Sequence, residues 1–359
     1  MTRVSPEVFE KHRAPSTVGQ LCQAEARLGM GGYAARDGAH LLSLVIKATL
    51  HGENLRSLLN FEIFWRKCVR YVRLLMNLQE MRILTRLLAE DGLQDIPRIQ
   101  PAFPFKFLHE QFLCRGLSSA DRLRCLLTNL RFWKSTLTAA ALAEVAGGQS
   151  CTIFDTHKSG CRVSIVFRLS HPAYLEGEMS AILKVDELEA YVVSFTVIPG
   201  SIVGCDSAHV LLISRMQGVK GALSACRRAQ EVIGIQAPRA LLDAVQGLAM
   251  AFGIEWLCAV RAENQPFYAP DQHDAFRAVY GCFFEAVGMS AGPKGFLRAH
   301  VPLPRNPVSA ANRRRARKRQ GIREALIEAV RARAGGLRRD CEQGNGVSET
   351  TRNARGASR

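Results

Sequence analysis

The segment AHVLLISRMQG (residues 208–218) and, after a long connection, the segment EWLCAVRAEN (residues 255–264) decide the fold. Each contains a short apolar run typical of a buried β-strand. The connection between them is far longer than a hairpin needs, and it contains two helical patterns. We therefore predict two parallel strands joined by a right-handed crossover whose helices cover one face of a sheet.

The connection also indicates where its two helices begin and end. Ser224 is a suitable amino-terminal cap for the first helix, and Gly234 is a suitable terminator because glycine readily adopts a left-handed conformation. Pro238 marks the start of the second helix and Gly253 its end. Between them, one apolar stripe recurs at three- and four-residue steps: Leu241, Leu242, Val245, Leu248, Ala249 and Phe252.

Composition limits the class of protein. Of the 359 residues, 47% are hydrophobic, which is ordinary for a chain with a packed core. No run reaches the roughly 18 apolar residues of a membrane span, and residues 1–13 lack the apolar core of a secretion signal. We therefore expect a cytoplasmic protein. The eleven cysteines contain no CxxC pair, so we expect reduced thiols and no metal site.

The formal net charge of +16 belongs mainly to the carboxyl-terminal segment. Residues 298–359 contain 16 Lys or Arg against 5 Asp or Glu, a net of +11, which leaves +5 for the other 297 residues. Such a segment attracts polyanions. We favour anionic lipid as the partner, because each basic side chain near an anionic membrane surface contributes about 1 kcal/mol to binding. The predicted contacts are Arg313, Arg314, Arg315, Arg317, Lys318 and Arg319.

Nucleic acid is the less favoured partner, because the segment has no interleaved aromatic residues and no recognised nucleic-acid module. A fully solvated tail is the third alternative. A second basic surface is predicted on the helix around residues 64–81, where Arg66, Arg70 and Arg73 share one face. That helix either lies on an anionic membrane or packs on the body with its charges in water.

The pattern along the chain predicts an α+β fold. Residues 1–39 are expected to be loosely ordered, residues 40–150 helical, and residues 151–304 a mixed α/β domain. Within that domain, residues 162–169, 178–185 and 191–198 alternate with period two and predict antiparallel strands. A helix at 275–289 and a last edge strand at 296–304 follow. Residues 305–334 predict a basic helix with Leu326, Ile327 and Val330 on one side, and residues 335–359 a disordered tail.

The order of motifs from about residue 65 to 330 resembles the VirK/YbjX family of Gram-negative bacterial proteins. The motifs are WRKCVRYVRLLMN (65–77), IQPAFPFKFLHEQF (99–112), SADRLRCLLTNLRFW (119–133), LEGEM (175–179), YVVSFTVI (191–198), LLISRMQG (211–218), IGIQAPRALL (233–242), AVRAEN (259–264) and VYGCFFEAVG (279–288). The resemblance implies accessory work in virulence, envelope integrity and resistance to cationic antimicrobial peptides. It implies no defined reaction.

The chain departs from this family's pattern at three places. Asn129 and Leu130 stand where the family usually has His and Tyr. Gly281 and Phe284 stand where it usually has Asp and Trp. The basic carboxyl-terminal run lacks the family's usual Tyr.

The order of elements is also similar to a GNAT-type acyltransferase core, which implies acyl-CoA as cofactor and a small-molecule acceptor. In such a core the pyrophosphate lies where a strand end meets the next helix. Gln217, Gly218 and Gly221 would then hold it, with Lys220 or Arg215 contacting a phosphate.

Two further residues would face the thioester in such a core: Asn264, and Tyr280 as general acid. A core aromatic is the alternative role for Tyr280. The long insertion between Gly221 and Pro238 argues against this second resemblance, because it displaces the turn that would hold the pyrophosphate.

Overall fold

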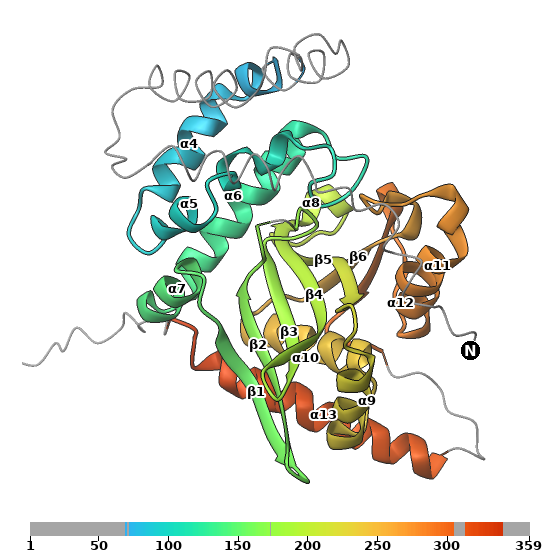
Figure 1. Cartoon of the computed structure of the whole chain (residues 1–359). Coiled ribbons are helices and arrows are strands. Elements are labelled where there is room, and N and C mark those ends of the chain that lie inside the picture. Colours follow the sequence, from blue (N-terminus) through green and yellow to red (C-terminus); the bar gives the residue numbers. More distant parts are fainter. Residues whose placement is uncertain (1–68, 70–71, 173, 305–312, 340–359) are drawn as a thin grey trace, which may run out of the picture.

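The computed structural model describes residues 69, 72–172, 174–304 and 313–339 (Figure 1). In this part of the chain, eight strands form a single open sheet in the order β1-β2-β3-β4-β5-β6-β8-β7. The predicted α+β class and mixed sheet are confirmed. The expectations for residues 1–39, for Arg66 and Arg70, and for residues 340–359 lie outside the described residues.

Antiparallel pairing joins the first five strands, whose alternating sequences place every second residue on the same face. These strands are β1 (Cys151–Lys158), β2 (Cys161–Leu169), β3 (Met179–Val185), β4 (Leu188–Pro199) and β5 (His209–Gly218). The sequence predicts β2, β3 and β4, whereas β1 was not predicted. Its second half, Asp155 to Lys158, is polar and partly exposed, so no apolar alternation marks it.

The predicted parallel pair is confirmed. β5 runs beside β6 (Trp256–Val260), with Leu211 opposite Leu257 and Ile213 opposite Ala259. The crossover contains α9 (Leu223–Ile233) and α10 (Ala237–Ala251), and Gly234 ends α9 with a φ of 87°. The prediction for Ser224 was wrong. It lies inside α9, whose cap position is Ala222, because the helix begins two residues earlier than the serine suggests.

The strand predicted at the sheet edge lies inside the sheet. β8 (Phe296–His300) pairs with β6 on one side and with β7 (Ser290–Ala291) on the other. The short β7 takes the edge because Gly288, with a φ of 93°, turns the chain back immediately after the preceding helix. That helix is interrupted: α11 (His273–Arg277) continues through the π-turn η6 (Ala278–Cys282) into α12 (Phe283–Ala286).

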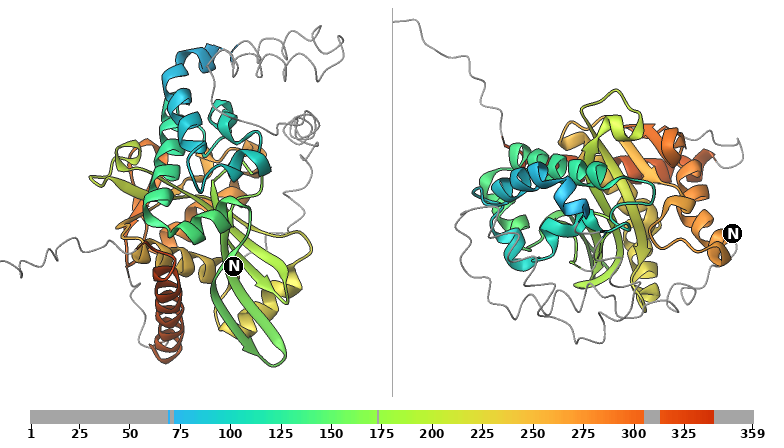
Figure 2. Two further views of the ribbon diagram at one scale, coloured as in Figure 1. Left: turned by 90° about the vertical axis from the view of Figure 1, so that its left-hand side faces the viewer. Right: turned by 90° about the horizontal axis from the view of Figure 1, so that it is seen from above.

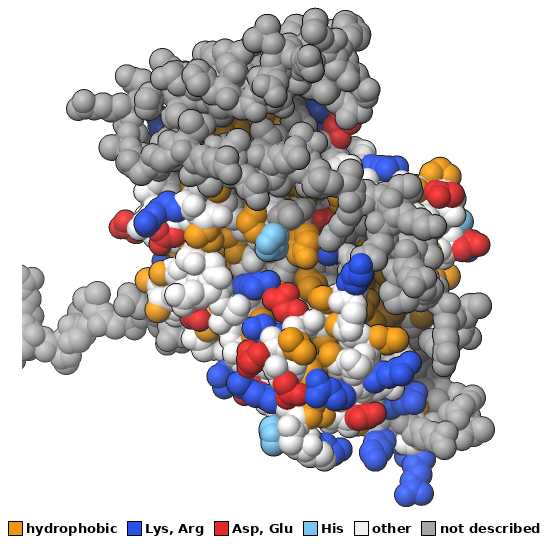
Figure 3. Space-filling view, in the orientation of Figure 1, with side chains coloured by type: hydrophobic (Ala, Val, Ile, Leu, Met, Phe, Trp, Pro, Cys, Tyr) orange, Lys and Arg blue, Asp and Glu red, His pale blue; other side chains and the backbone are white. Residues whose placement is uncertain are grey.

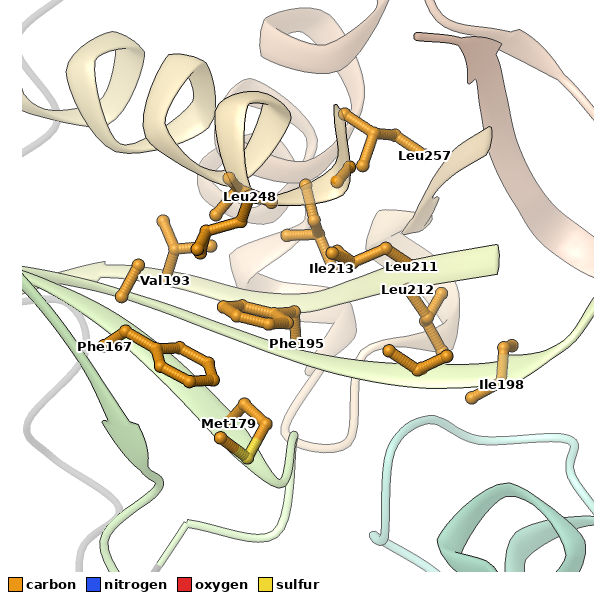
Figure 4. Close-up of a cluster of buried hydrophobic side chains, with 14 of the residues drawn as sticks. Phe167, Met179, Val193, Phe195, Ile198, Leu211, Leu212, Ile213, Leu248 and Leu257 are labelled. Atoms are coloured by element: carbon orange, nitrogen blue, oxygen red, sulfur yellow. The ribbon is translucent and has the colours of Figure 1, made fainter. Parts of the chain in front are cut away.

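One sheet face carries the main core. Phe167, Val193 and Phe195 project from it toward Leu248 of α10, and all four are fully buried (Figure 4). α6 (Ser119–Thr136) packs on β4 through Asn129, whose Oδ1 accepts hydrogen bonds from Val197 N and from Trp133 Nε1, at 2.9 Å each. Because a backbone N–H of β4 depends on this side chain, Asn129 fixes the helical region to the sheet.

The basic helix α13 (Arg313–Gly335) packs against α10 and also contacts β1 (Figure 2). As predicted from the sequence, Leu326 and Val330 are buried, and Ile327 is half-buried. The two helices approach closely because α10 carries Gly247, where an added Cβ would lie 2.7 Å from Ile327 O. Asp243 of α10 also accepts hydrogen bonds from Arg323 of α13, at 2.9 and 3.2 Å.

Five helices form a layer at one end of the sheet, shown at the top of Figure 1. They are α4 (Leu78–Leu88), α5 (Asp95–Ile99), η3 (Phe103–Leu108), α6 and α7 (Ala139–Ala146). Ser118 caps α6, because its Oγ accepts a hydrogen bond from Asp121 N at 3.0 Å. The sheet face opposite α10, called the open face below, meets this layer at η3 and at the loop between β2 and β3.

Candidate functional site

Four charged side chains are buried where the helical layer meets the open face. They are Lys106 of η3, Glu176 and Glu178 of the loop before β3, and Arg215 of β5. Charged groups are rarely buried unless they are paired, and buried charges often mark functional sites. We call these four residues the charged cluster.

Lys106 and Glu178 form the more deeply buried pair. Lys106 Nζ lies 3.5 Å from Glu178 Oε1, with exposed side-chain fractions of 3% and 0%. Neither Lys106 Nζ nor either carboxylate oxygen of Glu178 has a hydrogen-bond partner in the described part of the chain. Burial raises the pKa of Glu178 above its ordinary value, and the nearby ammonium of Lys106 opposes that rise.

Arg215 and Glu176 form the second pair. Arg215 Nε lies 3.9 Å from Glu176 Oε1, and the Arg215 guanidinium lies 3.6 Å from the ring centre of Tyr174. Arg215 also donates to Gln217 Oε1 from Nε and Nη2, at 3.1 and 2.7 Å. Its Nη1 has no hydrogen-bond partner among the described residues. The guanidinium is therefore stacked and held in place, with one nitrogen uncommitted.

A row of serine hydroxyl groups connects the strands beside the charged cluster. Ser180 Oγ lies 2.7 Å from Ser170 Oγ and 3.1 Å from Ser194 Oγ, so the row crosses from the end of β2 through β3 to β4. Gln100 fixes one end, because its Nε2 donates to Ser170 O at 2.7 Å. These contacts hold the polar side chains in fixed positions within an otherwise apolar region.

Tyr280, which belongs to η6, lies beside the charged cluster. Its hydroxyl group accepts from Met216 N and donates to Met216 O, at 3.3 Å each, so it uses a backbone position that β6 leaves unpaired. Burial raises the pKa of Tyr280 to about 12, although the Met216 hydrogen bond and Arg215 act in the opposite direction. π-turns such as η6 are frequent at functional sites.

The other predicted catalytic residue has a different environment. Asn264 Nδ2 donates to Gly295 O at 3.2 Å and to Lys294 O at 3.4 Å. An added Cβ at Gly295 would lie 2.0 Å from this nitrogen, so the glycine is required for the contact. The Asn264 amide therefore supports the loop before β8. The structure brings Arg215 and Tyr280 together at Met216, whereas Asn264 serves a neighbouring turn.

The predicted pyrophosphate-binding residues lie at the exposed end of β5. Gly218, Lys220 and Gly221 are exposed, and Gln217 is half-buried and bonded to Arg215. Gly221 has a φ of 75°, and an added Cβ there would have no atom within 4 Å. α9 begins two residues later, with no side-chain cap at Ala222. Its first N–H groups thus face an open, glycine-containing turn.

The predicted polyanion-binding residues lie at the amino-terminal end of α13. Arg314, Arg317, Lys318 and Arg319 are exposed, and the side chains of Arg313 and Arg315 lie outside the described part. Arg73 is half-buried, and its Nη2 lies 2.8 Å from Glu110 Oε1, so this residue packs on the body.

Sequence reasoning did not identify Lys106, Glu176 or Glu178 as site residues. The available signal was their position inside two of the motifs quoted above, IQPAFPFKFLHEQF and LEGEM. A charge within an apolar motif such as FPFKF is unusual, because surface lysines normally occur among polar residues.

Metal ligands do not gather within the described ranges: no group of three or more His, Cys, Asp or Glu could hold an ion there. The eight cysteines in the same ranges are all free thiols. Of the helices described, none is long and apolar enough to cross a bilayer.

Comparison with known proteins gave one match. A family model described as "Protein of unknown function (DUF535)" matches residues 60–332. No curated protein and no solved structure matches the chain. The matched range includes the charged cluster, Tyr280 and the glycine turn after β5.

Proposed function

The chain belongs to the DUF535 family, which contains VirK and YbjX, and from this premise we propose that it is an acyl-CoA-dependent acyltransferase. The family match covers the motifs from which the VirK/YbjX resemblance was predicted, and no reaction comes with it. The proposal therefore depends on the geometry around Met216, where an unpaired strand edge, an open glycine turn and a buried charged cluster adjoin.

The unpaired edge of β5 is the observation that carries the proposal. β5 and β6 pair only from Leu211 to Ile213, and β5 then continues for five residues to Gly218. Met216 has an N–H and a carbonyl group on this edge, and among the described residues the Tyr280 hydroxyl is the group that bonds to both. The pantetheine arm of an acyl-CoA contains amide groups, which can pair with such an edge when Tyr280 moves aside.

The turn after β5 supports binding of the pyrophosphate. The insertion that was expected to displace this turn forms α9 itself, and α9 starts two residues after Gly221. Its amino-terminal N–H groups and helix dipole favour an anion, and Lys220 lies in the same exposed turn. Arg215 is buried in the charged cluster, so we assign it to binding of the substrate that accepts the acyl group. We assign the phosphate contact to Lys220.

The charged cluster supports the part of the proposal that concerns the acceptor substrate. We assign the proton-accepting role to Glu176, which is paired with Arg215, next to Met216 in sequence. Glu176 would accept the proton of the acceptor amine or hydroxyl as the acceptor adds to the thioester carbonyl carbon. Tyr280 would donate its hydroxyl proton to the thiolate released when the carbon–sulfur bond breaks, which leaves free CoA and the acylated acceptor. The proton held by Glu176 would then return to Tyr280 through solvent, which restores both groups.

Ligand-induced stabilisation tests this proposal. A ligand at about 100 times its Kd stabilises a protein by about 2.7 kcal/mol. We expect at least one of acetyl-CoA, a medium-chain and a long-chain acyl-CoA to raise the melting temperature by several degrees. Free CoA and ATP serve as controls for the nucleotide part. Absence of any shift with the whole acyl-CoA series at about 1 mM would rule the proposal out.

We also propose a biological role in envelope integrity and in survival of cationic antimicrobial peptides, exercised from the cytoplasmic side, because the VirK/YbjX resemblance implies it. Deletion of the gene should lower the concentration of a cationic peptide that stops growth. The wild-type gene should restore resistance, whereas a Tyr280→Phe gene should not. Restoration by both genes would separate the biological role from acyl transfer.

A further inference from the structure

A mixed basic and apolar surface lies at the end of the molecule opposite the helical layer. It consists of the exposed side of α9, the start of β4 and the amino-terminal half of α13. Six of the seven residues 313–319 are Lys or Arg. Figure 3 shows Lys and Arg side chains gathered at the lower right, over α9 and this half of α13, beside apolar ones.

The two helices that form this surface are in contact. Gly234, at the end of α9, lies against Ile322 of α13, whose Cδ1 would be 3.0 Å from an added Cβ. The charges of α9 and of α13 therefore belong to one continuous region.

Basic side chains outnumber acidic ones on this surface, although its two helices also carry the exposed residues Glu231 and Glu324. Asp186 is paired with Arg228 at 2.7 Å, and Glu187 is paired with Arg162 at 3.1 Å. Five other basic side chains are exposed and make no ion pair within the described residues: Arg227, Arg314, Arg317, Lys318 and Arg319. Uncompensated charge of one sign attracts a polyanionic partner.

Exposed leucines beside these charges favour a membrane over a nucleic acid as the partner. Leu223 is 56% exposed and lies one helical turn before Arg227 on α9, and Leu188, at the start of β4, is 63% exposed. A membrane interface accommodates large apolar side chains next to basic ones. Nucleic acid would favour aromatic side chains for stacking, and neither α9 nor α13 contains one.

We propose that this surface, formed by Leu188, Leu223, Arg227, Arg317, Lys318 and Arg319, binds the face of an anionic phospholipid bilayer. The inference goes beyond acyl transfer and does not depend on it. Bound in this way, the protein would lie on the membrane with the helical layer directed away from the lipid. The exposed turn after β5 adjoins this surface through Leu223.

Vesicle co-sedimentation of the full chain tests the proposal. Vesicles of phosphatidylglycerol and phosphatidylcholine should bind the protein, and vesicles of phosphatidylcholine alone should not. We expect Arg317→Glu/Lys318→Glu/Arg319→Glu to weaken binding about tenfold or more. A matched control reverses three exposed charges of the helical layer, Arg82→Glu/Arg86→Glu/Arg131→Glu, and should bind like the wild type. Equal loss in the two triple variants would overturn the assignment of this surface.

Substitution of the two exposed leucines distinguishes lipid binding from nucleic-acid binding. Leu188→Ser/Leu223→Ser keeps every charge and replaces only exposed side chains, so folding should be preserved. We expect this variant to bind anionic vesicles about threefold or more weakly, and to leave any binding to single-stranded RNA unchanged. Unchanged vesicle binding, or RNA binding tighter than vesicle binding at equal salt, would contradict the proposal. Retained stabilisation by acyl-CoA in both surface variants would show that this test is independent of the enzymatic one.

Discussion

Lys106 Nζ lies 3.5 Å from Glu178 Oε1, and the two side chains have exposed fractions of only 3% and 0%. They come from separate layers, because η3 belongs to the helical layer and Glu178 opens β3. A charge pair in this position holds the two layers in register at the border of the candidate site. Loss of water from the two charges opposes the formation of such a pair. The contribution of the pair to stability therefore depends on both partners being present.

Removal of one partner of this pair should therefore cost more than removal of both. We expect Lys106→Met to destabilise the protein by about 3–5 kcal/mol, because it leaves Glu178 buried and unpaired. Lys106→Met/Glu178→Leu should recover most of that loss. Urea unfolding of the wild type and these two variants measures the difference. A double variant as unstable as the single one would show that the charges themselves are not the cause.

Glu178 should also make stability depend on pH. Burial raises its pKa in the folded protein, so between the ordinary and the raised value only the folded state holds the proton. The free energy of unfolding should therefore decrease as pH rises through that window and become level above it. Glu178→Gln, which stays neutral, should remove this decrease. Urea unfolding at a series of pH values checks the prediction, and identical slopes for wild type and variant would contradict it.

The fold around the crossover could be predicted because β5 and β6 are short apolar runs bounded by Gly218 and by polar residues. The buried stripe of α10 also follows directly from its period. The charged cluster could not be predicted in this way. Lys106 and Glu178 are 72 positions apart, and a single charge in a sequence normally indicates a solvated surface.

The helical segment from His273 to Ala286 also could not be predicted fully from the local sequence pattern. The sequence predicts one continuous helix at 275–289. The helix begins two residues earlier, at His273, with Phe276 packed in the core, and the π-turn η6 interrupts it at 278–282. The role of Asn264 as support for the Gly295 turn depends on a contact between residues 31 positions apart, which no local pattern encodes.

The close contact between α10 and α13 predicts opposite effects for two glycines. Gly247→Ala would place a Cβ 2.7 Å from Ile327 O, so we expect a loss of about 1–3 kcal/mol as α13 moves away. Gly321→Ala, on α13 with no atom within 4 Å of the added Cβ, should instead stabilise the protein by up to about 1 kcal/mol. Thermal unfolding compares the two variants. Equal effects would indicate that α13 does not pack closely on α10.

Tyr280→Phe should separate binding from turnover. The variant loses the hydroxyl that bonds to Met216 N and Met216 O, so the strand edge becomes free. We expect acyl-CoA to bind at least as tightly as to the wild type, and the proposed transfer to slow about 100-fold or more because the proton donor is gone. Steady-state kinetics distinguishes the two effects. A raised KM with unchanged kcat would assign Tyr280 to binding instead.

Calorimetric titration of acyl-CoA into the wild-type protein, Lys220→Glu and Lys158→Glu tests the central claim most directly. Lys220 lies in the turn before α9, whereas Lys158 is an exposed residue at the end of β1 and serves as the matched control. We predict saturable binding to the wild type, at least about tenfold weaker binding to Lys220→Glu, and unchanged binding to Lys158→Glu. No measurable binding by the wild type, or equal loss in both variants, would contradict the account.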